Sequence, residues 1–119
     1  MNHLMNLNHS PFELIKKGQK RVEMRLFDDK RKLINKGDTI EFTSLSSGEK
    51  LLVKVLDIKV FESFETLYKN YDKTLLGYLK GEKANPSDML EYYSLERIQE
   101  NGVCAIEIDM QRDVKTNED

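Results

Sequence analysis

A short basic string near the start of the chain, GQKRVEMR at 18–25, carries the residue types best suited to chemistry. Its charged and apolar side chains alternate, and successive side chains of a β-strand point to opposite faces. Val22 and the apolar residues that follow it at every second position are therefore expected to enter a core, while Glu23 and Arg25 line the other face. Lys20 follows a glycine turn, where a long cation can reach over a cleft. The string predicts a polar site on one face of a strand.

These side chains suit contacts with a nucleotide or a nucleoside. Lys20 and Arg25 can donate hydrogen bonds to a phosphate or a base carbonyl, whereas Glu23 can accept them from an exocyclic amine or a ribose hydroxyl. In a second interpretation the residues catalyse hydrolysis, with Glu23 as the general base that activates water and Lys20 stabilising the developing oxyanion. In a third they are an ion-pair group at the mouth of a barrel, and exposed pairs of that kind contribute only about 0 to 1 kcal/mol.

Basic residues are concentrated around this string. Residues 16–36 hold nine of the 19 Lys and Arg residues and three carboxylates, whereas residues 61–119 hold seven basic and thirteen acidic residues. This asymmetry, in a chain of net charge -2, indicates a basic patch that binds phosphate. Further candidate ligand-binding residues are Arg21, Lys30, Arg31 and Lys32. A solvated helix face would produce the same run for the last three.

Length and composition limit the classes of protein. A chain of 119 residues with 39% hydrophobic and 34% charged residues fits one globular domain. No apolar run approaches the roughly 20 residues of a transmembrane helix, and the N-terminus lacks the features of a secretory signal. One cysteine, Cys104, and two histidines exclude an internal disulfide and a cysteine-rich zinc site. We expect a cytoplasmic protein without a metal, a cofactor or a membrane partner.

Turn and capping signals divide the chain into short elements. Ser10 and Pro11 predict the start of a helix that ends at Gly18. Helices are predicted at 10–17, 28–35, 63–71, 85–93 and 94–100, the last three with Ser63, Asn85 and Ser94 as N-caps. Strands are predicted at 4–7, 20–26, 39–43, 51–61 and 103–110. The polar stretch 111–119 is expected to be a frayed tail.

The long strand at 51–61 changes the parity of its apolar residues. Val53 and Val55 lie at odd positions, whereas the apolar residues after Asp57 lie at even positions, which indicates a bulge. A bulge lets a small sheet curl into a barrel. The expected fold is therefore of the α+β class, with a bent sheet.

Two further segments supply candidate site residues. The loop at 77–84 contains two glycines, and Tyr78, Lys80 and Glu82 within it are candidates for binding or catalysis, although an ordinary connector is the alternative. Tyr92 and Tyr93 diverge by about 100 degrees on a helix, so one of them can face a cleft. We take Tyr93 as a candidate ligand-binding residue.

Three blocks of the sequence resemble an ASCH domain. They are the string at 18–25, KGDTIEF at 36–42, and YYS at 92–94 followed by GVCAIEI at 102–108. The resemblance implies a single domain over residues 1–110, a small bent PUA-like β-barrel of about five to six strands flanked by short helices. It also implies a basic cleft beside the barrel that accepts RNA or a nucleoside. Our first hypothesis is accordingly a binding module for RNA or a nucleoside, in RNA modification or translation-related regulation.

The chain also resembles small ASCH enzymes that deacetylate N4-acetylcytidine. Those enzymes use a lysine in the G-x-K position, a threonine three residues later as nucleophile, and a glutamate from a later loop. Lys20 matches the lysine and Glu82 the loop glutamate, but Glu23 stands at the threonine position. A carboxylate there cannot form the ester-type intermediate of a threonine oxygen, although it can activate water. The alternatives are thus a hydrolase for a modified nucleoside or for RNA, and a protein-interaction domain without nucleic-acid affinity.

Overall fold

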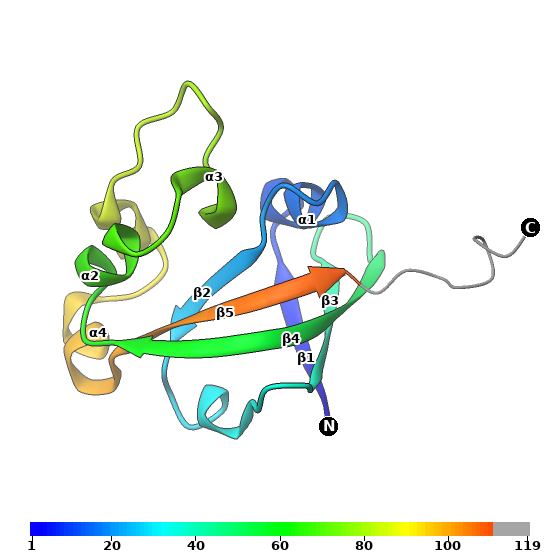
Figure 1. The fold of residues 1–119 in the computed structure, drawn as a ribbon, viewed down its shortest axis with the longest axis horizontal. Helices are drawn as coiled ribbons and strands as arrows, with labels where there is room; N and C mark the ends of the chain where they lie inside the picture. Colours follow the sequence, from blue (N-terminus) through cyan, green and yellow to red (C-terminus); the bar gives the residue numbers. More distant parts are fainter. Residues whose placement is uncertain (111–119) are drawn as a thin grey trace, which may run out of the picture.

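The computed structural model describes residues 1–110, and its five strands form one mixed sheet (Figure 1). The strands are β1 (Asn2–Leu7), β2 (Val22–Leu26), β3 (Thr39–Ser44), β4 (Lys50–Phe61) and β5 (Val103–Met110). Their order is β1-β3-β4-β5-β2, in which β1 and β3 are parallel and all other neighbours antiparallel. The sheet curls into a half-barrel with β1 and β2 as its edges, which confirms the predicted α+β class and bent barrel. The predicted tail at 111–119 lies outside the described residues.

The bulge in β4 lies where the sequence predicted it. The register between β4 and β5 shifts between Val55 and Asp57, so Leu56 has no partner on β5. Val53 and Val55 before the bulge and Ile58 after it all pack in the same hydrophobic cluster. Because side chains alternate along a strand, the extra residue keeps the apolar residues of both halves on the inner face.

Short helices connect the strands, and those between β4 and β5 gather on one side of the sheet (Figure 1). They are α1 (His9–Lys16), α2 (Phe64–Lys69), α3 (Lys73–Leu76) and α4 (Leu95–Asn101), with two 3₁₀ turns, η1 (Arg31–Leu33) and η2 (Pro86–Glu91). The predicted caps Ser63, Asn85 and Ser94 accept hydrogen bonds at the starts of α2, η2 and α4. Across residues 1–110 no helix has the length and apolar character needed to cross a bilayer.

The start of α1 and the segment after β2 differ from the prediction. α1 begins at His9 after Asn8, not after a Ser10 cap, because a proline is tolerated in a first turn whose N–H groups lack intrahelical partners. The helix predicted at 28–35 is only the single turn η1. Its Asp28 carboxylate accepts the backbone N–H of Arg31 at 3.1 Å, a local bond that competes with a longer helix.

The chain between β4 and β5 is more broken than predicted. α2 ends at Lys69, and Asp72 then caps α3, an element absent from the prediction. The helix predicted at 85–93 is the 3₁₀ turn η2. Helices this short are unstable alone, so tertiary packing holds them.

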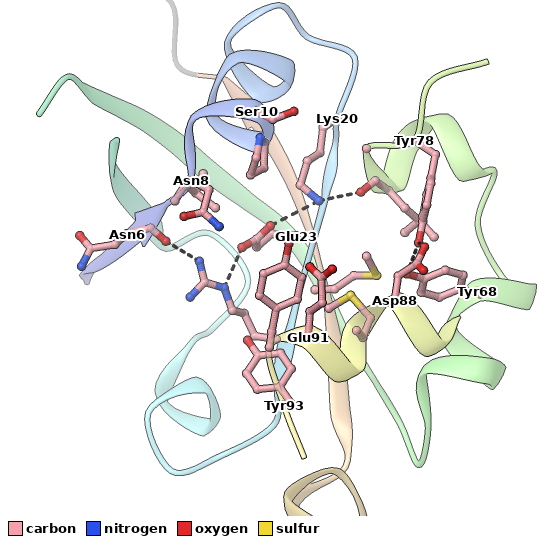
Figure 2. A pocket seen from close by; sticks show the side chains of 18 of the residues that line it. Asn6, Asn8, Ser10, Lys20, Glu23, Tyr68, Tyr78, Asp88, Glu91 and Tyr93 are labelled. Atoms are coloured by element: carbon pink, nitrogen blue, oxygen red, sulfur yellow. Dashed lines mark hydrogen bonds and ion pairs between the residues drawn. The ribbon is translucent and has the colours of Figure 1, made fainter. Parts of the chain in front are cut away.

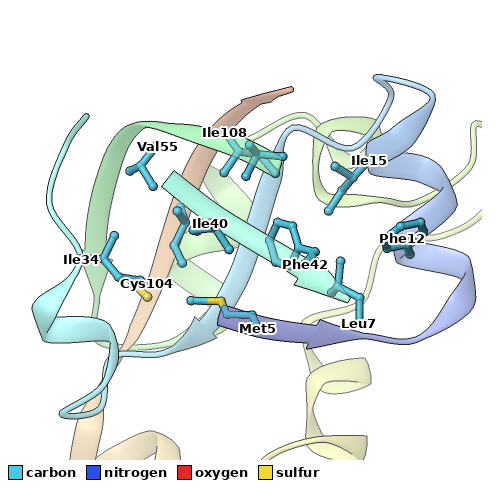
Figure 3. Close-up of a cluster of buried hydrophobic side chains, with 12 residues drawn as sticks. Met5, Leu7, Phe12, Ile15, Ile34, Ile40, Phe42, Val55, Cys104 and Ile108 are labelled. Carbon is cyan, nitrogen blue, oxygen red and sulfur yellow. The ribbon is translucent and has the colours of Figure 1, made fainter. Parts of the chain in front are cut away.

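Two hydrophobic clusters lie on the two faces of the sheet. The inner cluster fills the half-barrel and includes Phe12, Ile40, Phe42 and Cys104 (Figure 3). The outer cluster packs β2 and β5 against the helices; its members are Val22, Met24, Leu26, Phe64, Leu67, Leu76, Met89, Ile98, Val103 and Ala105. The outer cluster therefore places the segment from α2 to α4 beside β2.

The register of β2 decides where its polar residues point. Glu23 pairs with Ile106, and Arg25 pairs with Cys104. Directly opposed residues share a face of the sheet, and Ile106 and Cys104 belong to the inner cluster. Glu23 and Arg25 therefore face the interior of the half-barrel near its open side between β1 and β2. The alternation predicted one packed and one polar face, but the polar face is itself largely buried, with Glu23 only 5% exposed.

Candidate functional site

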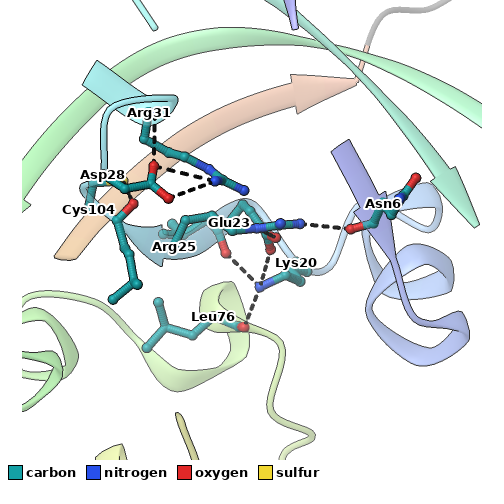
Figure 4. Close-up of polar contacts among 10 residues, drawn as sticks. Asn6, Lys20, Glu23, Arg25, Asp28, Arg31, Leu76 and Cys104 are labelled. Atoms are coloured by element: carbon teal, nitrogen blue, oxygen red, sulfur yellow. Dashed lines mark hydrogen bonds and ion pairs between the residues drawn. The ribbon is translucent and has the colours of Figure 1, made fainter. Parts of the chain in front are cut away.

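Lys20, Glu23 and Arg25 meet at the open side of the half-barrel (Figure 4). Lys20 Nζ lies 3.4 Å from Glu23 Oε1, and Arg25 Nε donates a hydrogen bond of 2.7 Å to Glu23 Oε2. Arg25 Nη2 also donates to the backbone carbonyl oxygen of Asn6 at 2.8 Å. Because Asn6 is in β1, this bond links the two edge strands across the opening. We call Lys20, Glu23 and Arg25 the ion triad.

Lys20 is held by backbone groups as well as by Glu23. Its Nζ donates to the carbonyl oxygens of Val22 and Leu76, each at 2.8 Å. An ammonium has three N–H donors, and these two carbonyls take two of them, while Glu23 is an ion-pair partner at 3.4 Å. The sequence suggested a cation reaching over a cleft, but Lys20 is buried and ties β2 to the end of α3.

Burial and pairing act in opposite directions on the triad. Burial lowers the pKa of Lys20 below its ordinary value, against the opposing effect of Glu23. Burial alone would raise the pKa of Glu23, but Lys20 and Arg25 together hold it below its ordinary value. For Arg25, burial acts to lower the pKa, and the Glu23 carboxylate outweighs it, so the pKa is raised. Glu23 is therefore a carboxylate and Arg25 a cation at neutral pH.

A cavity of about 500 Å³ opens beside the ion triad (Figure 2). It lies along the free edge of β2, between residues 6–11 at the end of β1 and start of α1 on one side and residues 76–93 on the other. Pockets that hold small ligands commonly measure about 300–1,000 Å³. The cavity is thus large enough for a small organic ligand.

Tyrosines form much of the wall that faces β2 (Figure 2). The hydroxyl oxygens of Tyr68 and Tyr78 are 2.9 Å apart, and the Tyr78 hydroxyl donates to Asp88 Oδ2 at 2.8 Å. Burial raises the pKa of both tyrosines, so both remain protonated at neutral pH. Tyr93 also lines the cavity, and its ring stacks on Phe64 with centroids 6.2 Å apart. The rings are therefore fixed by hydrogen bonding or packing.

The cavity brings together six of the site residues predicted from the sequence. They are Lys20, Glu23, Arg25, Tyr78, Glu82 and Tyr93. Glu82 is exposed at the rim, where its Oε1 accepts a hydrogen bond of 2.6 Å from the backbone N–H of Leu79. That bond shapes the loop at 77–84, so one of the carboxylate oxygens of Glu82 already has a partner.

Four of the predicted basic residues, all close to β2 in the sequence, are absent from the lining of this cavity. Arg21 Nε donates to a backbone carbonyl at 3.2 Å, and Arg21 borders a separate, smaller pocket. Arg31 pairs with Asp28 at 3.1 Å, and Lys30 and Lys32 are exposed. A role in ligand binding for these four residues stays a prediction, and it concerns a surface outside the cavity.

Residues on both sides of β2 line the cavity without having been predicted from the sequence. Asn6, Asn8 and Ser10 come from the junction of β1 and α1. A run of small polar residues directly after a strand was the signal, because such junctions often carry binding groups. Asp88 and Glu91 come from η2. Their spacing places them on one helical face, a pattern that a solvated surface shows equally well.

The lining of the cavity is more acidic than basic. Lys20 and Arg25 are the cationic residues that line it, against four carboxylates from Glu23, Glu82, Asp88 and Glu91. The expectation of a basic cleft is therefore wrong for this cavity, because the basic residues 30–32 lie in and beside η1, outside the lining. Within residues 1–110, no cluster of three or more His, Cys, Asp or Glu side chains is arranged to hold a metal ion.

Gly77, which ends α3, is expected to tolerate alanine poorly. Its φ is +110°, and an added Cβ would lie 3.1 Å from Cδ of Lys20. Gly77→Ala should lower the free energy of unfolding by about 1–2 kcal/mol, since an L-residue is strained in this conformation. Gly81→Ala is the control in urea denaturation: its Cβ meets nothing within 4 Å, so the change should stay below about 0.5 kcal/mol. Equal effects of the two substitutions would contradict the prediction.

Comparison with known proteins agrees with this architecture. The family model described as the ASCH domain matches residues 5–110. The crystal structure of the hypothetical protein PH0355 is similar with a TM-score of 0.79 and 36% sequence identity, over 93% of this chain and 100% of that chain. The solution NMR structure of protein PF0455 from Pyrococcus furiosus is similar with a TM-score of 0.70 and 35% identity, over 95% and 100% of the two chains.

No curated protein matches the chain. The family match nevertheless spans all the residues that line the cavity, from Asn6 to Tyr93. With this match, and with two solved structures of the same fold above 30% identity, the chain belongs to the ASCH domain family.

Proposed function

We propose that this chain binds a nucleobase in the cavity, either as part of RNA or as a free nucleoside. The observation that carries the proposal is a hydrogen-bond donor and an acceptor side by side in the lining. Arg25 Nη1 has no acceptor among residues 1–110, and each Glu23 oxygen has spare capacity beyond its single triad partner. A guanidinium and a carboxylate in this arrangement suit the carbonyl and amino groups of a base edge.

The tyrosines support the same proposal. Tyr92 is 57% exposed and lines the cavity together with Tyr93, so an aromatic face is accessible to a flat ligand. Stacking of a base on an aromatic side chain contributes about 1–3 kcal/mol to binding. The resemblance of the ASCH domain to PUA domains, which implies a ligand of RNA or nucleoside type, agrees with this lining. We further propose that residues 1–110 act as one cytoplasmic domain.

Thermal unfolding with added ligands tests the proposal. Cytidine, adenosine, uridine, guanosine and a short single-stranded RNA are each added at rising concentration and at two salt concentrations. A ligand at about ten times its Kd adds about 1.4 kcal/mol of stability, which raises Tm by roughly 5 °C for a domain of this size. We expect such a rise for at least one base that carries an exocyclic amine. An unchanged Tm with every nucleoside and with RNA would contradict the proposal.

A hydrolase that acts on a modified nucleoside or on RNA is the second candidate. The observation in its favour is the lowered pKa of the buried Lys20, because perturbed pKa values cluster at functional sites. Two features favour binding over turnover: two of the three N–H donors of Lys20 are taken by backbone carbonyls, and the lowered pKa of Glu23 makes it a weak general base. Incubation with N4-acetylcytidine separates the candidates, and we expect binding without release of acetate.

A further inference from the structure

The wall of the cavity that faces the ion triad is acidic. Glu82 comes from the loop after α3, and its exposed side chain lines the cavity. Asp88 and Glu91 come from η2, and their side chains are also exposed at the cavity (Figure 2). Within residues 1–110, Glu91 has no hydrogen-bond or ion-pair partner, and Asp88 accepts only the hydroxyl of Tyr78. The charges of Asp88 and Glu91 therefore act on whatever enters the cavity.

The cations of the cavity do not balance this wall. Lys20 and Arg25 are the cationic lining residues, and both pair with the buried carboxylate of Glu23. The basic residues nearest in sequence to the acidic wall, Lys80 and Lys83, are exposed and absent from the lining. The ion triad keeps one net positive charge against the three carboxylates of the wall, so a phosphate in the cavity would meet a lining of net negative charge.

Resting on the proposed function, we infer that Asp88 and Glu91 are specificity-determining residues that reject phosphorylated ligands, so that the cavity takes its base as a free nucleoside. A dianionic phosphate within several ångströms of two carboxylates is repelled, and the repulsion is strongest where the cavity wall excludes water. An amino group on the base is favoured by the same carboxylates. RNA, whose phosphates flank every base, is the disfavoured ligand.

The experiment compares cytidine and adenosine with their 5′-monophosphates by titration calorimetry at low and high salt. The wild-type protein is expected to bind a nucleoside at least about tenfold more tightly than its monophosphate at low salt, and the ratio should shrink at high salt because salt screens exposed charges. The variants are Glu91→Gln and the double variant Asp88→Asn with Glu91→Gln. Both keep the shape of the wall, and an asparagine oxygen can still accept the Tyr78 hydroxyl.

Both variants are expected to lower the ratio of nucleoside affinity to monophosphate affinity, and the double variant should lower it at least about threefold. The matched control is Glu100→Gln, an exposed carboxylate on α4 outside the lining, which should leave the preference unchanged. Glu91→Gln alone keeps the test valid if the double variant fails to fold, because the Glu91 side chain makes no hydrogen bond or ion pair within residues 1–110.

The possible outcomes separate this inference from the proposed function. Tighter binding of the nucleoside, with a preference that narrows in the variants, supports both. A monophosphate or a short RNA that binds as tightly as the nucleoside, or variants that keep the full preference, overturns the role of Asp88 and Glu91 and leaves nucleobase binding standing. Absence of binding by every ligand overturns both.

Discussion

Replacing Lys20 by methionine is expected to lower the free energy of unfolding by about 3–5 kcal/mol, the usual cost of removing one partner from a buried ion pair. Methionine fills much of the same space but provides no charge. The substitution leaves the carbonyl oxygens of Val22 and Leu76 without their donor and leaves the buried Glu23 with Arg25 alone. Urea denaturation measures the loss, and ligand binding should weaken with it because the wall at Leu76 loses one of its links to β2.

Two further variants make this result specific. Lys17→Met removes an exposed lysine from the same segment and should change the free energy of unfolding by less than about 0.5 kcal/mol. Adding Glu23→Gln to Lys20→Met should restore part of the lost stability, because it removes the partly uncompensated carboxylate. A cost of under about 1 kcal/mol for Lys20→Met would instead match an exposed ion pair, the third interpretation of the sequence.

Replacing Arg25 by methionine should affect ligand affinity more than any other single change in the lining. Arg25 bridges Glu23 and the carbonyl of Asn6, and hydrogen bonds to charged groups contribute about 1.5–3 kcal/mol each. We expect a stability loss of about 2–3 kcal/mol and, at a temperature where the variant is folded, nucleoside affinity at least about thirtyfold weaker, equivalent to about 2 kcal/mol. Calorimetric titration and urea denaturation measure the two effects.

A conservative variant separates the two roles of Arg25. Arg25→Lys keeps the charge beside Glu23, but a single ammonium lacks the planar fork that serves Glu23, Asn6 and a ligand together. It should therefore recover part of the stability without recovering the affinity. Arg97→Met, on α4 outside the cavity, is the control and should leave the affinity unchanged. Normal nucleoside affinity in Arg25→Met would place the binding site elsewhere.

Local patterns in the sequence predicted the strands and several boundaries of helices. The parity change between Val55 and Ile58 predicted the bulge in β4, and Ser63 and Ser94 predicted the starts of α2 and α4. These signals depend on side-chain alternation and on hydrogen bonds within a few residues, so they do not depend on where the segment lies in the tertiary structure. Helix α3 was not predicted at all. It has only four residues, and packing stabilises it more than its own helix propensity does.

The amino-acid sequence alone determined where the strands lie along the chain, the bulge that bends the sheet, and the presence of Lys20, Glu23 and Arg25 on one short segment. Only the tertiary structure decided that Lys20 is buried, that the basic run at 30–32 lies outside the cavity, and that Asp88 and Glu91 face the triad. The physical reason is the distance along the chain. Alternation and capping act over a few residues, whereas the cavity joins segments far apart in sequence, which approach because the outer hydrophobic cluster is buried between them.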